Sequence, residues 1–347
     1  MSTARRHPLP LGAVVLPPRW PRRSRPRARL ALRHLRVPFT AQKAWHRHCS
    51  AVVLSRFDQR PCRAVHLVLL HAAPRGRDLD PKQRLHLKVA REAIDDAGET
   101  QWKGTNVGVY IGCYGQDLYD LSVRDTQAHG IYQVLGQNDF MVSNRLFHEL
   151  DLHGPSVALR TACSASLIGV NEACMSIARG DCTAAIVGGT NIIMAPAFTA
   201  ANSEQGVLSL DGSCNTFSAN ANGYGCAPGG RGQGGNPVRA VVTCSADNHN
   251  GHARTVSHPS SQTQDVLLKQ ACLNAGIAGM TRTGFSQCHG TWARTGGFIE
   301  VAALSPCLSK LGVHIGSVKV NLSHAEGAVG LVSVLKAVPS LENALSP

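Results

Sequence analysis

Short apolar runs alternate with amphipathic segments from about residue 79 to the end of the chain. A short apolar run bounded by turn residues is typical of a buried strand, whereas apolar residues that recur every three or four positions are typical of a helix. The runs that predict strands cover residues 107–112, 157–159, 183–189, 238–243, 285–288 and 315–320. The segments that predict helices cover residues 81–97, 138–148, 164–179, 262–275 and 328–338. Strands that alternate with helices predict a layered α/β fold.

The junction between the strand at 157–159 and the helix at 164–179 carries a cysteine, Cys163, with only small residues beside it. A tight strand-to-helix turn needs small neighbours and presents the side chain at its tip. The free N–H groups and the dipole at a helix N-terminus also favour a thiolate. The helix is apolar on most sides, which predicts a buried helix. These features point to nucleophilic catalysis by Cys163. The alternative is a structural cysteine, since a free cysteine is usually a small buried hydrophobe.

Two histidines, His289 and His324, each stand just after a predicted strand. The ends of the strands in an α/β sheet are where ligands bind. We therefore expect both imidazoles to converge on the thiol of Cys163. Taken singly, either histidine would more often be a structural or surface residue.

The positive charge of the chain is concentrated at its start. Residues 1–50 contain 12 of the 35 Lys and Arg residues and no Asp or Glu, whereas residues 79–347 hold 18 Lys and Arg against 20 Asp and Glu. We interpret residues 1–78, here called the N-terminal segment, as a basic Arg/Pro-rich leader that is disordered or unrelated to the domain. An apolar run at 51–54 has no clear partner. A nucleic-acid-binding arm is the alternative that charge alone allows, but nothing in the near-neutral remainder supports nucleic-acid binding.

The twelve cysteines are scattered and form no C-x-x-C pair, which argues against a zinc ribbon or a thioredoxin-like site. Most lie in apolar runs, as reduced cysteines do in intracellular proteins, so we expect a cytoplasmic location. No apolar run is as long as a membrane span, and we expect no membrane partner.

Three ordered motifs make the chain resemble the β-ketoacyl synthases. Thr161 to Leu167 resembles their nucleophile motif, His289 to Thr291 the start of their first histidine motif, and Gly316 to Glu326 their second. Further stretches resemble the ketosynthase domain of iterative, reducing type I polyketide synthases: 80–84 (Asp-Pro-Lys-Gln-Arg), 130–136 and 204–209.

The resemblance implies a thiolase-like fold, layered αβαβα, with two related halves. Residues 79–347 would be a partial ketosynthase domain, with an N-terminal half at about 79–240 and a C-terminal half at about 241–347. Terminal and internal strands of the family are expected to be missing. The family's opening strand has no counterpart before residue 79, and only a short Gly-rich segment precedes residue 238.

The activity that the resemblance implies is the decarboxylative Claisen condensation of malonyl-ACP with an acyl chain held on Cys163. His289 and His324 would donate hydrogen bonds to the malonyl thioester carbonyl and stabilise the enolate. Lys319 and Glu326 would support the second histidine as an internal ion pair. Thr291 would contact the pantetheine arm.

The resemblance also bears on partners and cofactors. No metal or bound cofactor is expected, because the phosphopantetheine arm arrives on a partner acyl carrier protein with the acyl and malonyl thioesters. Members of the family dimerise through the sheet edge near the nucleophile, so a homodimer is one expectation. The alternative function is a catalytically impaired ketosynthase-like module for binding or dimerisation. It is suggested by Trp292, which stands where the family has glycine, and by the strands expected to be missing at the ends; Ser323 also replaces a glycine of the family.

Overall fold

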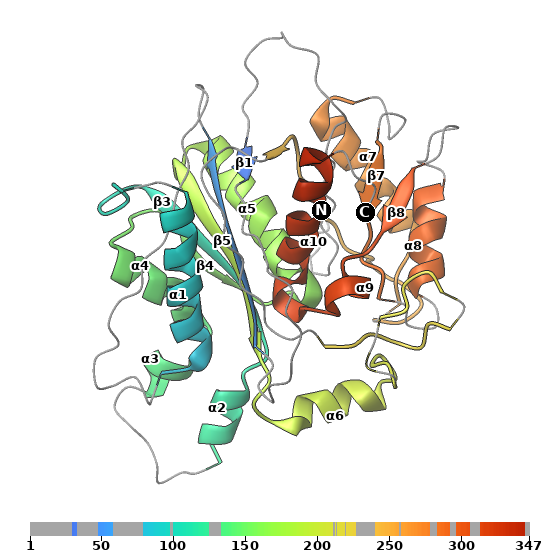
Figure 1. Ribbon diagram of the computed structural model, residues 1–347, viewed down its shortest axis with the longest axis horizontal. Coiled ribbons are helices and arrows are strands. Elements are labelled where there is room, and N and C mark those ends of the chain that lie inside the picture. The colour runs from blue at the N-terminus through green and yellow to red at the C-terminus, as the bar shows by residue number, and fades with distance from the viewer. Residues whose placement is uncertain are drawn as a thin grey trace, which may run out of the picture.

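The computed structural model describes most of the chain from residue 79 onwards and two segments before it. The described residues are 30–32, 48–57, 79–97, 100–124, 133–210, 212, 214–218, 220–226, 240–256, 258–277, 283–291, 296–305 and 313–343. They form helices and strands in successive layers (Figure 1).

The larger sheet has six strands in the order β4-β3-β5-β2-β1-β6. Strands β3, β4 and β5 are parallel to one another, while β2, β1 and β6 each pair antiparallel with the strand before them in that order. The strands are β1 (Leu30–Leu32), β2 (His48–Phe57), β3 (Val107–Tyr114), β4 (Ser156–Leu159), β5 (Ala184–Ile192) and β6 (Ala240–Val242). The mixed sheet fits the predicted α/β class.

Strands β1 and β2 lie inside the N-terminal segment, where we predicted a disordered or unrelated leader. β2 pairs with β5 over nine residue pairs, beginning with His48 opposite Ile192. For these two strands the prediction of a disordered leader is wrong, because both pair within the larger sheet. The apolar run at 51–54 lies in β2 and pairs with β5, more than 100 residues further along the chain. Local sequence patterns cannot reveal such a distant pairing. The rest of the N-terminal segment, and most of the Gly-rich stretch before residue 238, lie outside the described residues.

Two helical layers cover the two faces of this sheet (Figure 1). Helices α1 (Pro81–Asp96) and α4 (Phe140–Leu150) pack on one face, and α5 (Ala165–Arg179) and α10 (Val329–Glu342) on the other. Successive side chains of a strand point to opposite faces. Ile111 of β3 accordingly joins the core under α1 and α4, whereas its neighbour Tyr110 joins the core under α5 and α10.

The ends of two predicted helices follow from their sequence. Asp80 caps α1, because its carboxylate accepts a 2.7 Å hydrogen bond from the backbone N–H of Lys82. Gly180 ends α5 in the left-handed region, at a φ of 83°. α5 is less buried than predicted, since Met175 is 48% exposed on its outer side.

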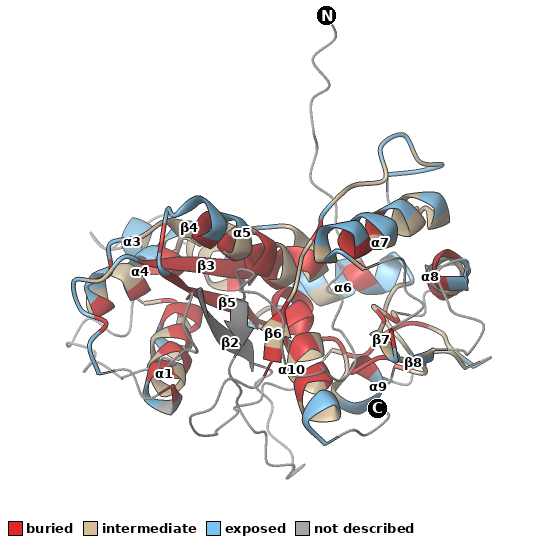
Figure 2. Ribbon diagram, turned by 90° about the horizontal axis from the view of Figure 1, so that it is seen from above, coloured by how far each residue is buried: buried red, intermediate tan, exposed pale blue. Residues whose placement is uncertain are grey.

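The C-terminal part adds a two-stranded parallel sheet and its own helices. Strands β7 (Phe285–Gln287) and β8 (His314–Gly316) pair, and α7 (Ser261–Ala275) and α8 (Gly296–Leu304) lie beyond them. α7 turns a buried side inward and an exposed side outward (Figure 2). The strand predicted over 315–320 stops early, because the chain turns into a short helix from residue 319.

Several short elements complete the described structure. They are α2 (Asp117–Ser122), α3 (Gln133–Gln137), α6 (Pro196–Glu204), α9 (Lys319–Leu322) and the 3₁₀ turns η2 (Ala162–Ser164) and η5 (Glu326–Ala328). Among the described helices, none has the length and apolar character that crossing a bilayer requires.

Candidate active site

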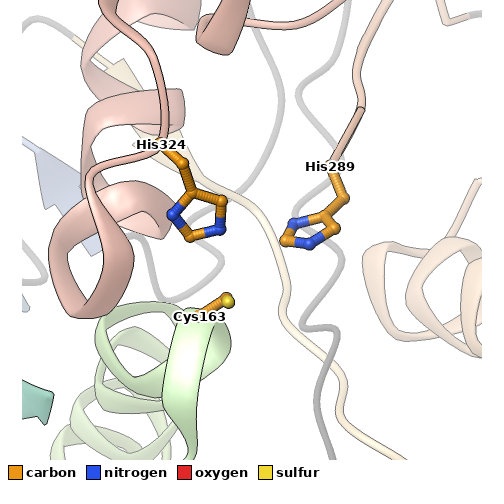
Figure 3. Close-up of side chains that lie close together, drawn as sticks. All are labelled: Cys163, His289 and His324. Carbon is orange, nitrogen blue, oxygen red and sulfur yellow. The ribbon is translucent and has the colours of Figure 1, made fainter. Parts of the chain in front are cut away.

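The structure brings together the three residues on which the sequence analysis centred (Figure 3). The sulfur of Cys163 and a ring nitrogen of each of His289 and His324 all lie within 4.8 Å of one another. The two imidazoles cross nearly at right angles, with ring centroids 5.9 Å apart. The thiol comes from the turn before α5, His289 from the loop after β7, and His324 from the turn after α9.

The turn that carries Cys163 is tight and strained. Ala162 has a φ of 51°, in the left-handed region that favours glycine. Ser164 holds the turn by donating from its hydroxyl to the carbonyl of Thr161 at 2.6 Å. The start of α5 also passes close to β3, where a Cβ on Gly112 would lie 2.6 Å from the backbone nitrogen of Ser166. Only glycine fits at that crossing, so this residue helps to fix where the thiol is presented.

Burial dominates the acidity of the thiol. It raises the pKa of Cys163 to about 11, and the nearby Lys319 acts in the opposite direction. Burial of the thiol therefore acts against the thiolate that a helix N-terminus favours. The local reason is that desolvation disfavours the charged form more strongly than the neighbouring positive charge favours it.

His324 is held in one tautomer. Its Nδ1 accepts a 2.8 Å hydrogen bond from the backbone N–H of Glu326. A backbone N–H can only donate, so in the neutral ring the hydrogen sits on Nε2. That Nε2 is buried and has no hydrogen-bond partner. Burial, with Lys319 and His289 nearby, holds the pKa of His324 well below its usual range. The ring is thus a neutral donor with its hydrogen unused.

His289 is held in the same way by a lysine. The Nζ of Lys319 lies 3.3 Å from its Nδ1 and also donates to its backbone carbonyl. A protonated lysine has donors only, so Nδ1 accepts and Nε2 carries the hydrogen. Burial and the charge of Lys319 hold the pKa of His289 well below its usual range. Lys319 is itself 1% exposed, and burial lowers its pKa to about 8.

Glu300 of α8 is a site residue that the sequence analysis missed. Its two oxygens accept from the backbone N–H groups of His289, at 2.5 Å, and Gly290, at 2.9 Å. It also raises the pKa of Lys319, against the effect of burial. The signal was present, because Glu300 is the one charged residue in the otherwise apolar sequence of α8.

The predicted ion pair between Lys319 and Glu326 is wrong. Both residues are described, and no ion pair joins them, because Lys319 is turned toward His289. The Oε1 of Glu326 instead lies 3.9 Å from the sulfur of Cys226. Burial raises the pKa of Glu326 to about 7. Each residue therefore supports a different part of the site.

The surroundings of the two rings are aromatic and polar. The ring of Tyr224 lies 4.5 Å from that of His324, centroid to centroid. Thr216 donates to the carbonyl of Gly290 at 2.7 Å, which fixes the loop after β7. Thr291 follows in this loop and is half-buried. Trp292, which stands where the family has glycine, lies outside the described residues.

The spacing of one thiol and two imidazoles raises the question of a metal site. A zinc ligand must offer a lone pair. In both His289 and His324 the Nδ1 lone pair already accepts a hydrogen bond, and Nε2 carries the hydrogen. The ammonium group of Lys319 adds a positive charge beside them. The set is therefore unsuited to a cation and suited to binding an oxygen atom that gains negative charge.

Comparisons with known proteins agree on one family. The family "Beta-ketoacyl synthase, N-terminal domain" matches residues 69–231, and "Beta-ketoacyl synthase, C-terminal domain" matches residues 239–347. Highly reducing polyketide synthase sphB of Aspergillus fumigatus is 48% identical over 283 residues, which are 77% of this chain and 11% of that protein. Highly reducing polyketide synthase VdtX of Byssochlamys spectabilis is 41% identical over 78% of this chain and 13% of that protein.

Solved structures give the same result. The oxazolomycin ketosynthase domain OzmH KS7 of Streptomyces albus aligns with a TM-score of 0.69 and 30% identity, over 77% of this chain and 50% of that one. The ketosynthase from module 6 of the bacillaene synthase of Bacillus subtilis aligns with a TM-score of 0.65 and 26% identity, over 78% of this chain and 49% of that one. The layered α/β architecture is thus the thiolase-like ketosynthase fold.

The share of each relative that is matched is small. The chain spans about a tenth of the length of the fungal polyketide synthases and about half of the solved ketosynthase chains. Both family matches and the layered fold nevertheless point the same way. The chain belongs to the β-ketoacyl synthase family and is related to the ketosynthase domains of fungal highly reducing polyketide synthases.

Proposed function

We propose that this chain catalyses the condensing step of its family: decarboxylative Claisen condensation of a malonyl thioester with an acyl chain held on Cys163. One observation supports the proposal most directly. A thiol meets two neutral imidazoles, His289 and His324, each with its hydrogen on Nε2. Such donors stabilise an oxygen that becomes negative during a reaction, because they are in place before the charge develops.

In the first step, the sulfur of Cys163 attacks the carbonyl carbon of an acyl thioester. A new C–S bond forms to Cys163, and the bond to the carrier sulfur breaks. The proton of the Cys163 thiol ends on the departing carrier thiol, so the exchange is balanced. The high pKa of Cys163 means that proton transfer must accompany attack.

In the second step, the carbonyl oxygen of the malonyl thioester accepts hydrogen bonds from Nε2 of His289 and His324. The bond to the carboxylate breaks, CO₂ leaves, and the electron pair forms an enolate. The enolate carbon then attacks the Cys163 thioester, and the cysteine sulfur leaves as a thiolate, which takes up one proton from solvent to restore the thiol. The charge of Lys319 beside His289 strengthens that donor, because an interaction in a buried site is screened little.

The partner of this chemistry is an acyl carrier protein that delivers both thioesters on its phosphopantetheine arm. We propose that Thr291, at the edge of the site, contacts this arm. The chain would need no resident cofactor. A division into related halves at about residue 240 and a homodimer belong to the same proposal.

A non-catalytic binding or dimerisation module is the second candidate. The observation that favours it is the raised pKa of Cys163, because a neutral thiol is a poor nucleophile.

Acylation of the intact protein distinguishes the two candidates. We expect that incubation with an acyl-pantetheine thioester adds the mass of one acyl group, which peptide mapping places on Cys163. Cys163→Ala should abolish this addition, because the nucleophile is gone. Cys174→Ala is the matched control, since Cys174 lies in α5 outside the site, and it should leave acylation unchanged. A wild-type protein that gains no acyl mass would favour the module.

A further inference from the structure

The Asp-Pro-Lys-Gln-Arg motif at the start of α1 has no place in the proposed chemistry, yet it places a charged side chain in the interior. Lys82 is 2% exposed. Its Nζ donates to the carbonyl of Gly115 at 2.7 Å and to Oδ1 of Asp139 at 2.8 Å, and it lies 3.6 Å from Oδ2 of Asp80. This one ammonium group therefore joins the start of α1, the residue after β3 and the residue before α4.

The contacts continue from Asp139 toward the catalytic turn. The Nε of Arg160 lies 3.2 Å from Oδ2 of Asp139, and its Nη1 donates to Oε1 of Gln116 at 3.1 Å. Arg160 is the residue directly after β4 and stands three positions before Cys163. An unbroken set of polar contacts thus runs from Lys82 to the backbone that enters the turn.

The turn needs such support. Among the described strands, β4 is at the edge of the sheet, pairs only with β3, and is four residues long. The strained φ of Ala162 follows it. A strained backbone persists only when its surroundings over-determine it. Arg160 is the first residue after this strand, so its ion pair with Asp139 restrains the segment that leads into the turn.

We infer that Lys82 is a positioning residue for Cys163, acting through Asp139 and Arg160 to fix the turn that presents the thiol to the two imidazoles. The inference deepens the proposed function and rests on it. A buried ion pair is weak evidence for stability, because desolvation offsets its attraction, whereas specification of one geometry is a use that such pairs can serve.

Arg160→Gln is the first test, because half of this side chain is exposed, 54%, and it lines an open cleft of about 290 Å³. The fold should tolerate the change. We expect acylation of Cys163 by an acyl-pantetheine thioester to slow by about 10- to 100-fold, as a small misplacement of a reacting group does. The slowing should appear in kcat and not in KM. Arg160→Lys, which keeps the charge beside Asp139, should recover part of the rate.

A matched control exists in the helix that follows the turn. Arg179 at the far end of α5 forms an exposed ion pair with Asp181 at 2.8 Å and is 52% exposed. Arg179→Gln removes an equivalent pair without touching the turn, so acylation should stay at the wild-type rate. An equal loss in both variants would overturn the inference.

The pathway through Asp139 is tested by Lys82→Met, Asp139→Asn and the double variant. If Lys82 acts through Asp139, the double variant acylates at the rate of Asp139→Asn alone. Removing both charges together also avoids leaving the carboxylate of Asp139 without the ammonium group of Lys82. Effects of the two substitutions that simply multiply would overturn the pathway. Should Lys82→Met fail to fold, the inference is still tested by comparing the double variant with Asp139→Asn and by the acylation rate of Arg160→Gln.

Alkylation by iodoacetamide separates this inference from the proposed function, because it needs no acyl transfer. A loosened turn should expose the thiol, so peptide mapping should show faster alkylation of Cys163 in Arg160→Gln. Cys272 of α7, which is 2% exposed, is the internal control and should not change. Unchanged alkylation at Cys163 would overturn the inference even if acylation occurs. Faster alkylation with no acylation in the wild type would support it while the proposed function fails.

Discussion

At the residue scale, hydrogen-bond direction determines what the site can do. His289 and His324 are both neutral, and in both the Nδ1 lone pair is occupied by a donor, Lys319 in one case and a backbone N–H in the other. Sequence motifs name the imidazoles but cannot give their tautomers, because the donors depend on how separate loops meet. The same limit applies to Cys163, because its burial, which raises the pKa of the thiol, depends on how the layers pack around the turn.

A second residue-scale feature is the strained backbone directly before His324. Ser323 has a φ of 59° and a ψ of −169°, a region that essentially only glycine adopts. We predict that Ser323→Gly stabilises the protein by about 1 kcal/mol, the lower end of the strain that such a residue stores. Urea unfolding would measure the change.

Ser203 provides the control for this prediction, because it is exposed within α6 and has ordinary helical geometry. Ser203→Gly should destabilise by about 0.5 kcal/mol, since glycine is the poorer helix former. If Ser323→Gly destabilised the protein as Ser203→Gly does, the strain at Ser323 would be ruled out.

At the element scale, the site depends on short helices and strands that carry the functional side chains at or near their ends. α8 delivers Glu300 to two backbone N–H groups of the loop after β7, and the start of α9 buries Lys319 beside His289. The helices α1, α4, α5, α7 and α10 and the strands β3 to β8 were predictable because their periodicity is local. β2 was not predicted, because its apolar run at 51–54 stands alone in the basic N-terminal segment. The first residues of α9 were assigned to a predicted strand.

The electrostatic interaction of Glu300 in α8 with Lys319 in α9 predicts that decarboxylation depends on pH. Burial lowers the pKa of Lys319 to about 8, so its charge is present below pH 8 and is lost as the pH rises through that value. We expect release of CO₂ from a malonyl thioester to fall over the same range. The measurement is best made in Cys163→Ala, which removes the titration of the thiol.

Glu300→Gln tests the cause of that fall. Glu300 raises the pKa of Lys319, so its loss should move the fall in CO₂ release to lower pH. Glu204→Gln, at the exposed end of α6, is the control and should leave the profile unchanged. A profile that is the same in wild type and Glu300→Gln would show that Lys319 does not govern the step.

At the scale of the whole molecule, the fold acts by bringing distant parts of the chain together. The helix α5, which follows the turn with Cys163, covers the larger sheet, whereas β7, which precedes His289, belongs to the smaller one (Figure 1). The sequence allowed this convergence to be predicted, because each residue stands at the end of a strand or turn. It did not allow the contacts of Lys319, Glu300 and Glu326 to be predicted, because they depend on side-chain directions where the layers meet.

The most direct test of the central claim is a single turnover of acyl-loaded protein with a malonyl thioester, followed by mass spectrometry and CO₂ measurement. We predict that the wild type forms one 3-oxoacyl thioester and one CO₂ per site. Cys163→Ala should release CO₂ without forming that product, and His324→Ala should do neither. Product formation that survives in His324→Ala or Cys163→Ala would contradict a mechanism in which one thiol and two neutral imidazoles act together.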